Sequence, residues 1–310
     1  MSTKKIYVAG HKGMVGSAIC RQLSKNRDIE LITANREDLD LISQSSVEAF
    51  LSEKKPDIVI IAAAKVGGIL ANNNYKAQFI YENLMIQTNL IHSSYLVGVK
   101  KLIFLGSSCI YPKYSKQPIS EKYLLSGKLE KTNDAYAVAK ISGIKMCQAY
   151  NKQYKTNYIC LMPTNLYGPN DNYNLKSSHF FPALINKIHQ AKSKKKKSIT
   201  LWGDGTPMRE IMFVDDLADA CEFFLKKKTK FTLINIGSGT EKSILGYANF
   251  LLKRMNINLK INFDKRKPNG TPRKKLNFNL AKKYGWKSKT SLAEGFKITY
   301  DDFIKNKRYK

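Results

Sequence analysis

The chain has 310 residues, 43% of them hydrophobic, which is enough for one large domain or two moderate ones with a packed core. A strand pattern begins directly after the first residues and the longest apolar run, 58–64, is too short for a bilayer, so we expect a cytoplasmic protein without a signal peptide or membrane anchor. The net charge of +29 suits an anionic partner, but the lysine runs lack aromatic residues or a nucleic-acid motif, so we predict no nucleic-acid partner.

Short apolar runs and helical periodicity alternate through the first half of the chain. Strands are predicted over 5–10, 29–34, 57–63, 100–107 and 158–163, and helices over 14–25, 45–54, 77–97 and 134–154. This alternation is typical of an α/β protein with a Rossmann-type, doubly wound parallel sheet, which we place in residues 1–165. Residues 166–310 are predicted to form mainly a smaller α/β substrate-binding lobe, with segments near 208–238 returning to the sheet. Ligands are expected in the cleft, at the carboxyl ends of the strands.

A glycine-rich turn follows the first predicted strand. Gly10, Gly13 and Gly16 have the spacing GxxGxxG at the start of a helix, where the backbone can approach a pyrophosphate. Asn35 and Arg36 stand at the end of the second strand, where an NAD site usually carries an acid. Because a cation suits a 2′-phosphate, the sequence predicts NADP(H), with a second positive charge from Lys12. Asp40 belongs to the next turn, where it either caps the following helix or contacts the adenine.

A Tyr–Lys pair on the long helix 134–154 carries the predicted proton chemistry. Tyr136 and Lys140 are spaced i, i+4, so both lie on one face of the helix, and we expect the ammonium to lower the pKa of the phenol. Ser107, at the end of the preceding strand, can hydrogen-bond the same substrate oxygen. Cys109 follows it closely, and from its position alone this thiol is either core filler or a proton carrier. None of the five cysteines has metal-ligand or CxxC spacing, so we expect reduced thiols and no metal site.

Together these motifs resemble the extended short-chain dehydrogenase/reductases over almost the whole chain. The stretches that carry the resemblance are AGHKGMVGSAI (9–19), AAAKVGGI (62–69), FIYENLMIQTN (79–89), LGSSCIYP (105–112), YAVAKISGIK (136–145), MPTNLYGPNDN (162–172), WGDGTPMRE (202–210) and PNGTPRK (268–274). In these stretches the chain is similar to the branch of that family that converts GDP-4-keto-6-deoxy-D-mannose to GDP-L-fucose by 3,5-epimerisation and NADPH-dependent 4-reduction.

The resemblance also implies roles for individual residues. Ser107, Tyr136 and Lys140 would serve the reduction, and Cys109 with His179 the epimerisation. Substrate contacts are implied for Lys187, Trp202 and Arg209, whereas Asn269 stands where the family typically carries an acid. The implied cofactor contacts are Gly10, His11, Lys12, Gly13, Met14, Val15, Gly16, Asn35, Arg36, Asp38, Leu39, Leu105, Gly106, Ser107, Ser108, Lys140, Pro163, Thr164, Asn165, Leu166 and His179. A homodimer paired through the helices near 77–97 and 134–154 is also implied.

Several alternatives stay open at the level of sequence. A C4 reductase of another GDP-4-keto-6-deoxy sugar, such as a heptose, would carry much the same motifs, although Cys109 and His179 favour retained epimerisation. A UDP-sugar 4-epimerase is disfavoured by Asn35 and Arg36, which suit NADP rather than NAD. A regulatory dinucleotide-binding protein without catalysis is disfavoured by the Ser107, Tyr136 and Lys140 set.

Overall fold

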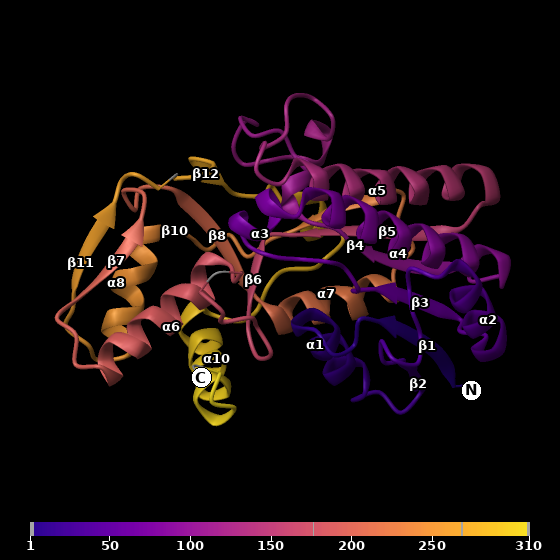
Figure 1. Ribbon diagram of the computed structural model, residues 1–310. Coiled ribbons are helices and arrows are strands. Elements are labelled where there is room, and N and C mark those ends of the chain that lie inside the picture. The colour runs from indigo at the N-terminus through magenta and orange to yellow at the C-terminus, as the bar shows by residue number, and fades with distance from the viewer. Residues whose placement is uncertain (1–2, 176, 268, 309–310) are drawn as a thin grey trace.

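The structure is a computed structural model that describes residues 3–175, 177–267 and 269–308. A large sheet lobe and a smaller second lobe lie beside each other in Figure 1. The sheet lobe is built from strands β1 (Lys4–Ala9), β2 (Ile29–Ile32), β3 (Ile58–Ile61), β4 (Lys101–Leu105), β5 (Asn157–Pro163) and β9 (Leu233–Ile236). Its helices are α1 (Met14–Leu23), α2 (Gln44–Lys54), α3 (Ile69–Asn74), α4 (Lys76–Leu96), α5 (Asp134–Tyr154) and α7 (Val214–Leu225).

The six strands of this lobe form one parallel sheet in the order β2-β1-β3-β4-β5-β9, with Ile6 opposite Ile58 and Phe104 opposite Cys160 in the register. The predicted α/β class and doubly wound sheet are therefore confirmed. Strand β9 joins the sheet from far along the chain, within the segment predicted to return. The chain reverses direction across the sheet at β1, so the carboxyl ends of β1 and β3 flank the switch point where such sheets bind ligands.

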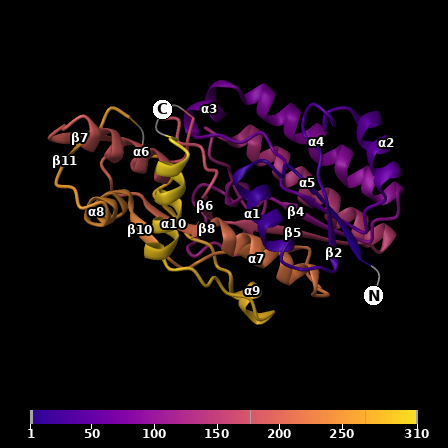
Figure 2. The same ribbon diagram turned by 90° about the horizontal axis from the view of Figure 1, so that it is seen from below.

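Successive side chains of each strand point to opposite faces of the sheet, and both faces are buried. Ile6 and Val8 pack with α1 and α7, whereas Tyr7 and Ala9 pack with α2, α4 and α5. Figure 1 shows α4 and α5 above the sheet and α1 and α7 below it, and Figure 2 shows α1 and α7 side by side. Both faces are therefore apolar, which explains why the strand sequences read as nearly continuous hydrophobic runs.

The second lobe has its own hydrophobic core, which includes Tyr167, Phe181, Tyr247 and Phe303. Its strands are β6 (Asn165–Tyr167), β7 (Ser198–Trp202), β8 (Met208–Phe213), β10 (Glu241–Ser243), β11 (Lys260–Asp264) and β12 (Arg273–Lys274). Its helices are α6 (Phe180–Ser193), α8 (Ile244–Arg254) and α10 (Leu292–Lys305), while α9 (Asn279–Lys283) packs back against the sheet lobe. The division of the chain into a sheet domain up to residue 165 and a second lobe from residue 166 stays a prediction, and the separate cores agree with it.

Within the first half of the chain, one α-helix was not expected from the sequence. Helix α3 precedes α4, and Tyr75 separates them with a non-helical backbone of φ −119° and ψ 36°. The three asparagines 72–74 have low helix propensity, and that explains why periodicity alone did not reveal a helix here.

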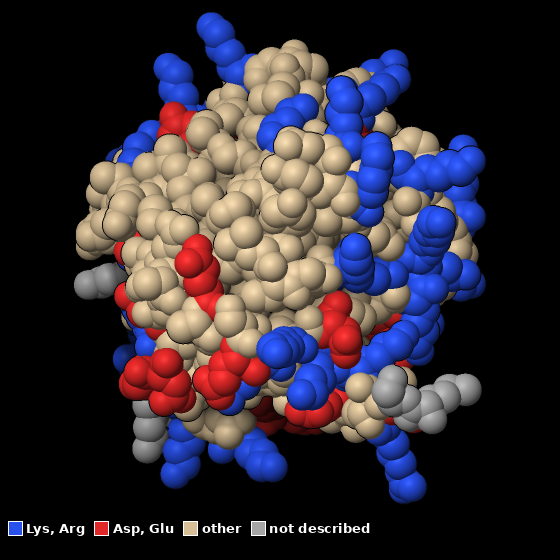
Figure 3. All heavy atoms as spheres, turned by 90° about the vertical axis from the view of Figure 1, so that its right-hand side faces the viewer, with Lys and Arg blue, Asp and Glu red and all other residues tan. Residues whose placement is uncertain are grey.

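The surface carries the strong positive charge of the sequence. On the face drawn in Figure 3, Lys and Arg side chains project around most of the outline, while Asp and Glu lie mainly low in the view. Among the described residues, no helix combines the length and apolar character needed to span a membrane.

Candidate active site

A cavity of about 700 Å³ lies at the carboxyl ends of the central strands. Its walls come from the glycine turn after β1, the ends of β2 to β5, helix α5 and the segment before α6. Every implied cofactor contact lines it except Asp38, and Tyr136 lines it as well. The structure therefore brings together residues from distant parts of the chain that sequence analysis assigned to one site.

The glycine turn is shaped for close backbone approach. Gly10 has φ +85°, and a Cβ there would lie 2.7 Å from the backbone of Ala63. A Cβ on Gly16 would lie 2.1 Å from the carbonyl oxygen of Gly10. Gly13 is the N-cap of α1 and provides no side-chain cap, and the first turn has no acid, so the first amides of the helix can bind an anion. The turn thus fits the pyrophosphate of a dinucleotide.

The end of β2 determines the charge near the expected 2′-phosphate. The exposed Arg36 lines the cavity beside Asn35, whose amide donates to Asp38 Oδ2 at 2.9 Å. Asp38 itself is exposed and lies outside the cavity wall. Asp40 lines the cavity, but Ser43 caps α2, so the helix-cap alternative for Asp40 was wrong.

The predicted Tyr–Lys pair lies on one face of α5, as expected, but its electrostatics differ from the prediction. Lys140 is 2% exposed and donates from Nζ to the Leu105 carbonyl at 3.0 Å; this Nζ lies 5.8 Å from the Tyr136 ring centroid. Burial lowers the pKa of Lys140 to about 8. Burial, together with the nearby Cys109, raises the pKa of Tyr136, so the expected lowering by Lys140 was wrong. A buried phenol retains its proton and can donate it.

Cys109 lies in a 3₁₀ turn, Ser108–Ile110, directly after β4. It is 6% exposed, its backbone amide donates to Ser107 Oγ at 3.4 Å, and the two serines that precede it line the cavity. Burial raises the pKa of the thiol, while Lys274, Ser107 and Lys140 act to lower it. The thiol therefore has the cationic surroundings that a proton-transferring cysteine requires.

Lys274 was missed by the sequence analysis. It lies on β12, and its charge acts on both Cys109 and His179. His179 lines the cavity at the start of α6. Burial, and to a smaller extent the charge of Lys274, lowers the pKa of its imidazole. The basic run after the Gly–Thr–Pro turn was the only sequence signal for Lys274, because its neighbours come from distant segments.

Arg209 lies beside Lys274 on the adjacent parallel strand, since the two residues are partners in the register of β8 and β12. Arg209 Nη1 donates to the Met208 carbonyl at 2.8 Å, and burial lowers the pKa of the guanidinium to about 10. Within the described residues no carboxylate forms an ion pair with Arg209. Two neighbouring, poorly hydrated cations form a site suited to an anion.

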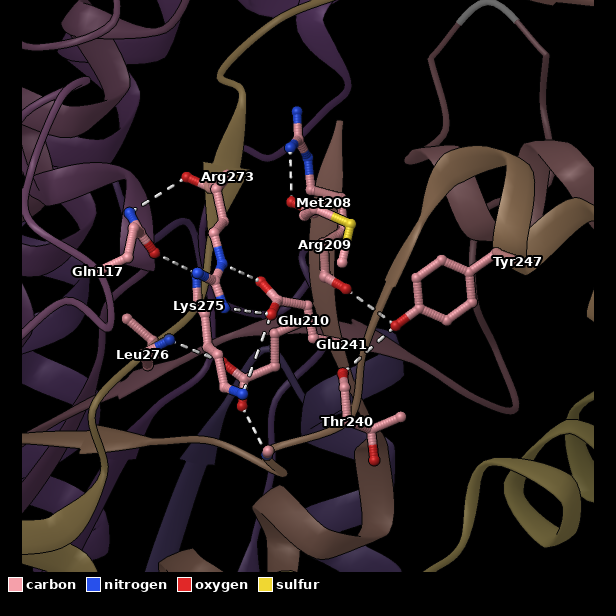
Figure 4. Close-up of polar contacts among 11 residues, drawn as sticks. Gln117, Met208, Arg209, Glu210, Thr240, Glu241, Tyr247, Arg273, Lys275 and Leu276 are labelled. Atoms are coloured by element: carbon pink, nitrogen blue, oxygen red, sulfur yellow. Dashed lines mark hydrogen bonds and ion pairs between the residues drawn. The ribbon is translucent and has the colours of Figure 1, made fainter. Parts of the chain in front are cut away.

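Buried carboxylates hold this pair of strands in place (Figure 4). Glu210 is fully buried and accepts backbone N–H bonds from Gly239 at 2.7 Å and Leu276 at 2.8 Å. Glu241 accepts a bidentate pair from Arg273 at 2.8 and 2.7 Å. These bonds fix the segments on either side of Arg209 and Lys274.

The other implied substrate contacts lie in the second lobe, outside the cavity wall. Lys187 Nζ donates to the Thr200 carbonyl at 3.1 Å, and Trp202 is 48% exposed with Lys267 Nζ 5.5 Å from its ring centroid. Asn269 Oδ1 accepts the amide of Asp204 at 2.9 Å and so supports the adjoining turn. Substrate contacts by Lys187 and Trp202 stay predictions.

This fold, with a glycine turn at its switch point and a Tyr–Lys pair facing the same cavity, defines a Rossmann-type dinucleotide-dependent class. The chain belongs to the NAD dependent epimerase/dehydratase family, whose sequence model matches residues 6–237.

Three known proteins show where the chain lies within that family. It is 53% identical over 303 residues to a GDP-L-fucose synthase of Sinorhizobium fredii (strain NBRC 101917 / NGR234), covering 98% of this chain and 96% of the relative. It is 45% identical over 315 residues to the GDP-L-fucose synthase of Escherichia coli (strain K12), covering 99% and 98%. A GDP-mannoheptose C4 reductase from Campylobacter jejuni, solved with NADP bound, superposes with a TM-score of 0.88 at 37% identity, covering 98% and 99%.

Proposed function

We propose that this protein catalyses 3,5-epimerisation and NADPH-dependent 4-reduction of GDP-4-keto-6-deoxy-D-mannose to GDP-L-fucose. The observation that carries the proposal is one cavity lined by Ser107, Tyr136, Lys140 and His179, with Cys109 directly beyond Ser107 and Ser108. Relatives named GDP-L-fucose synthase at 45–53% identity support the substrate. The NADP bound to the similar heptose reductase supports NADP(H) as cofactor.

The reduction needs a proton donor beside C4. NADPH, when bound, supplies the hydride. Tyr136 retains its proton at neutral pH because burial raises its pKa, and it donates that proton to the C4 oxygen. Ser107 donates a hydrogen bond to the same oxygen. Lys140, held by the Leu105 carbonyl and lined up on the same helix face, orients the cofactor ribose beside Tyr136.

The epimerisation needs a base and an acid on opposite sides of the sugar. The C4 ketone acidifies the hydrogens at C3 and C5, and Cys109 as thiolate removes a proton while His179 returns one to the other face. Lys274 opposes the rise that burial causes in the pKa of Cys109. Burial together with Lys274 lowers the pKa of His179, which makes its imidazolium a stronger acid. The diphosphate of the substrate is assigned to Arg209 and Lys274, and the GDP part to Lys187 and Trp202.

A steady-state assay in deuterated water tests this function. Purified protein is incubated with NADPH and GDP-4-keto-6-deoxy-D-mannose, and the product is examined by NMR. We expect NADPH oxidation with deuterium at both C3 and C5, and slower turnover with NADH. Turnover without deuterium incorporation would contradict the proposed epimerisation and favour a C4 reductase of a GDP-heptose type of substrate. Turnover of UDP sugars alone would contradict the proposed GDP-sugar substrate. We also propose that the protein is a cytoplasmic homodimer.

A further inference from the structure

The segment Lys65–Gly68 between β3 and α3 is held by two buried amide side chains. Asn83, 2% exposed, accepts the Lys65 amide at 3.1 Å and donates to the Lys65 carbonyl at 3.0 Å. Asn72, 6% exposed, donates to the carbonyls of Gly67 at 2.7 Å and Gly68 at 3.1 Å. The segment is therefore fixed to α3 and α4, more firmly than a surface loop requires.

On its other side this segment contacts the chain directly before His179. The Gly68 amide donates to the Ser177 carbonyl at 2.8 Å. A Cβ on Gly68 would lie 2.6 Å from the Ser178 carbonyl oxygen and 3.3 Å from that of Ser177. Gly68 has an ordinary φ of −68°, so its backbone conformation does not require glycine. What requires glycine is the close approach of the two backbones.

We propose that Gly68 is a positioning residue for His179. Asn72 fixes Gly68, and Gly68 binds the Ser177 carbonyl and lies closely against that of Ser178. These contacts set the position of His179, the N-cap of α6. The contact joins the sheet lobe, which carries Cys109, to the segment that carries its partner. This assignment rests on the proposed function, in which Cys109 and His179 act on opposite faces of one sugar.

Gly68→Ala tests the proposal, with Gly67→Ala as matched control. The methyl of Gly68→Ala meets backbone oxygens, whereas that of Gly67→Ala would meet only side chains, Ala71 Cβ at 3.0 Å and Phe79 Cζ at 3.2 Å. Deuterium exchange at C3 and C5 is measured on the full chain without NADPH. We expect a loss of about tenfold or more in Gly68→Ala, with NADPH affinity within about twofold, and a loss below about threefold in Gly67→Ala.

A double-mutant cycle separates positioning from a general structural effect. If Gly68 acts through His179, adding Gly68→Ala to His179→Gln causes no further loss of exchange. Independent, additive losses would overturn the proposal, as would wild-type exchange in Gly68→Ala. Should Gly68→Ala not fold, Asn72→Ala, which removes the two bonds that fix Gly67 and Gly68, is expected to show the same dependence on His179 with a smaller loss.

A measurement without substrate distinguishes failure of this proposal from failure of the proposed function. The chain has four histidines, so the ring NMR signals of His179 are assigned by their absence in His179→Gln. We expect Gly68→Ala to shift the titration of His179 while leaving that of His189 unchanged. An unchanged His179 titration would overturn the positioning role, whatever the substrate. Absence of C3 and C5 exchange in the wild-type protein would overturn the proposed function instead.

Discussion

The protonation of the Cys109 thiol depends on burial and on neighbouring cations. Burial raises the pKa of this 6% exposed thiol, and the charges of Lys274 and Lys140 act in the opposite direction. Cys109→Ser replaces the thiol with a hydroxyl that does not ionise near neutral pH. We expect deuterium exchange at C3 and C5 to fall about a hundredfold or more, with unchanged NADPH affinity by fluorescence titration. Normal turnover of Cys109→Ser would show that the thiol only fills the core.

Asp171 is a second residue whose burial has a measurable consequence. It is 9% exposed, Oδ1 accepts the Asn172 amide at 2.7 Å, and Oδ2 has no hydrogen-bond partner among the described residues. Burial raises its pKa to about 7, against the opposing charge of Arg308. Between about pH 4 and 7 the folded carboxyl therefore holds a proton that the unfolded chain has lost, so its contribution to stability falls as pH rises.

Asp171→Asn removes this titration. We expect the variant to be more stable than wild type by about 1–3 kcal/mol at pH 8, where the wild-type carboxylate is charged in both states. Near pH 4 most of that advantage disappears, because the folded carboxyl is already neutral. Unfolding midpoints of both proteins measured at the two pH values give the difference directly. An advantage of equal size at both pH values would contradict this explanation.

At the scale of elements, the sequence predicted the sheet lobe well because its signals are local. Buried strands and amphipathic helices alternate, and each boundary fell within a few residues of the observed one; strands β2, β3 and β4 each end two residues early. The glycine turn and the Tyr–Lys pair are also local patterns. Lys274 and Asp171 gave no such signal, because β12 is two residues long and the surroundings of both residues come from distant segments.

Strand β8 carries a buried carboxylate, Glu210, that bonds to two other segments of the chain. Glu210 uses Oε1 for the Gly239 amide and Oε2 for the Leu276 amide, and so joins β8 to two other segments. In Glu210→Gln one oxygen becomes an amide donor that faces another donor. We expect a loss of about 2–4 kcal/mol in unfolding free energy, with a raised KM because Arg209 adjoins this position.

Urea unfolding and steady-state kinetics check the result. Asp215→Asn provides a matched control, because it removes a surface ion pair with Arg21 in which both side chains are over 40% exposed. That change should cost less than about 1 kcal/mol. If Glu210→Gln were as stable as the control, the buried carboxylate would not be what holds the strands together.

At the scale of the whole molecule, α4 and α5 form an outer layer that exposes several apolar side chains. Lys76 pairs with Asp134 at 2.8 Å near the start of both helices, and the rings of Tyr95 and Tyr154 stack at 4.1 Å near their ends. The helices therefore run parallel and in register. Their exposed apolar side chains are Tyr81 (57%), Leu96 (55%), Val138 (42%) and Tyr154 (40%).

This register places Tyr81 level with Val138, so each helix has an exposed apolar side chain at the same height of the layer. Exposed apolar side chains on two parallel helices are suited to pairing with a second copy through a four-helix contact. We expect a homodimer by light scattering, and expect Tyr81→Glu combined with Val138→Glu to give a monomer, because charges would be buried without partners. Tyr114→Glu, at an 81% exposed position on a loop, should leave the dimer intact. A wild-type monomer, or a dimer that survives both charges, would place the contact elsewhere.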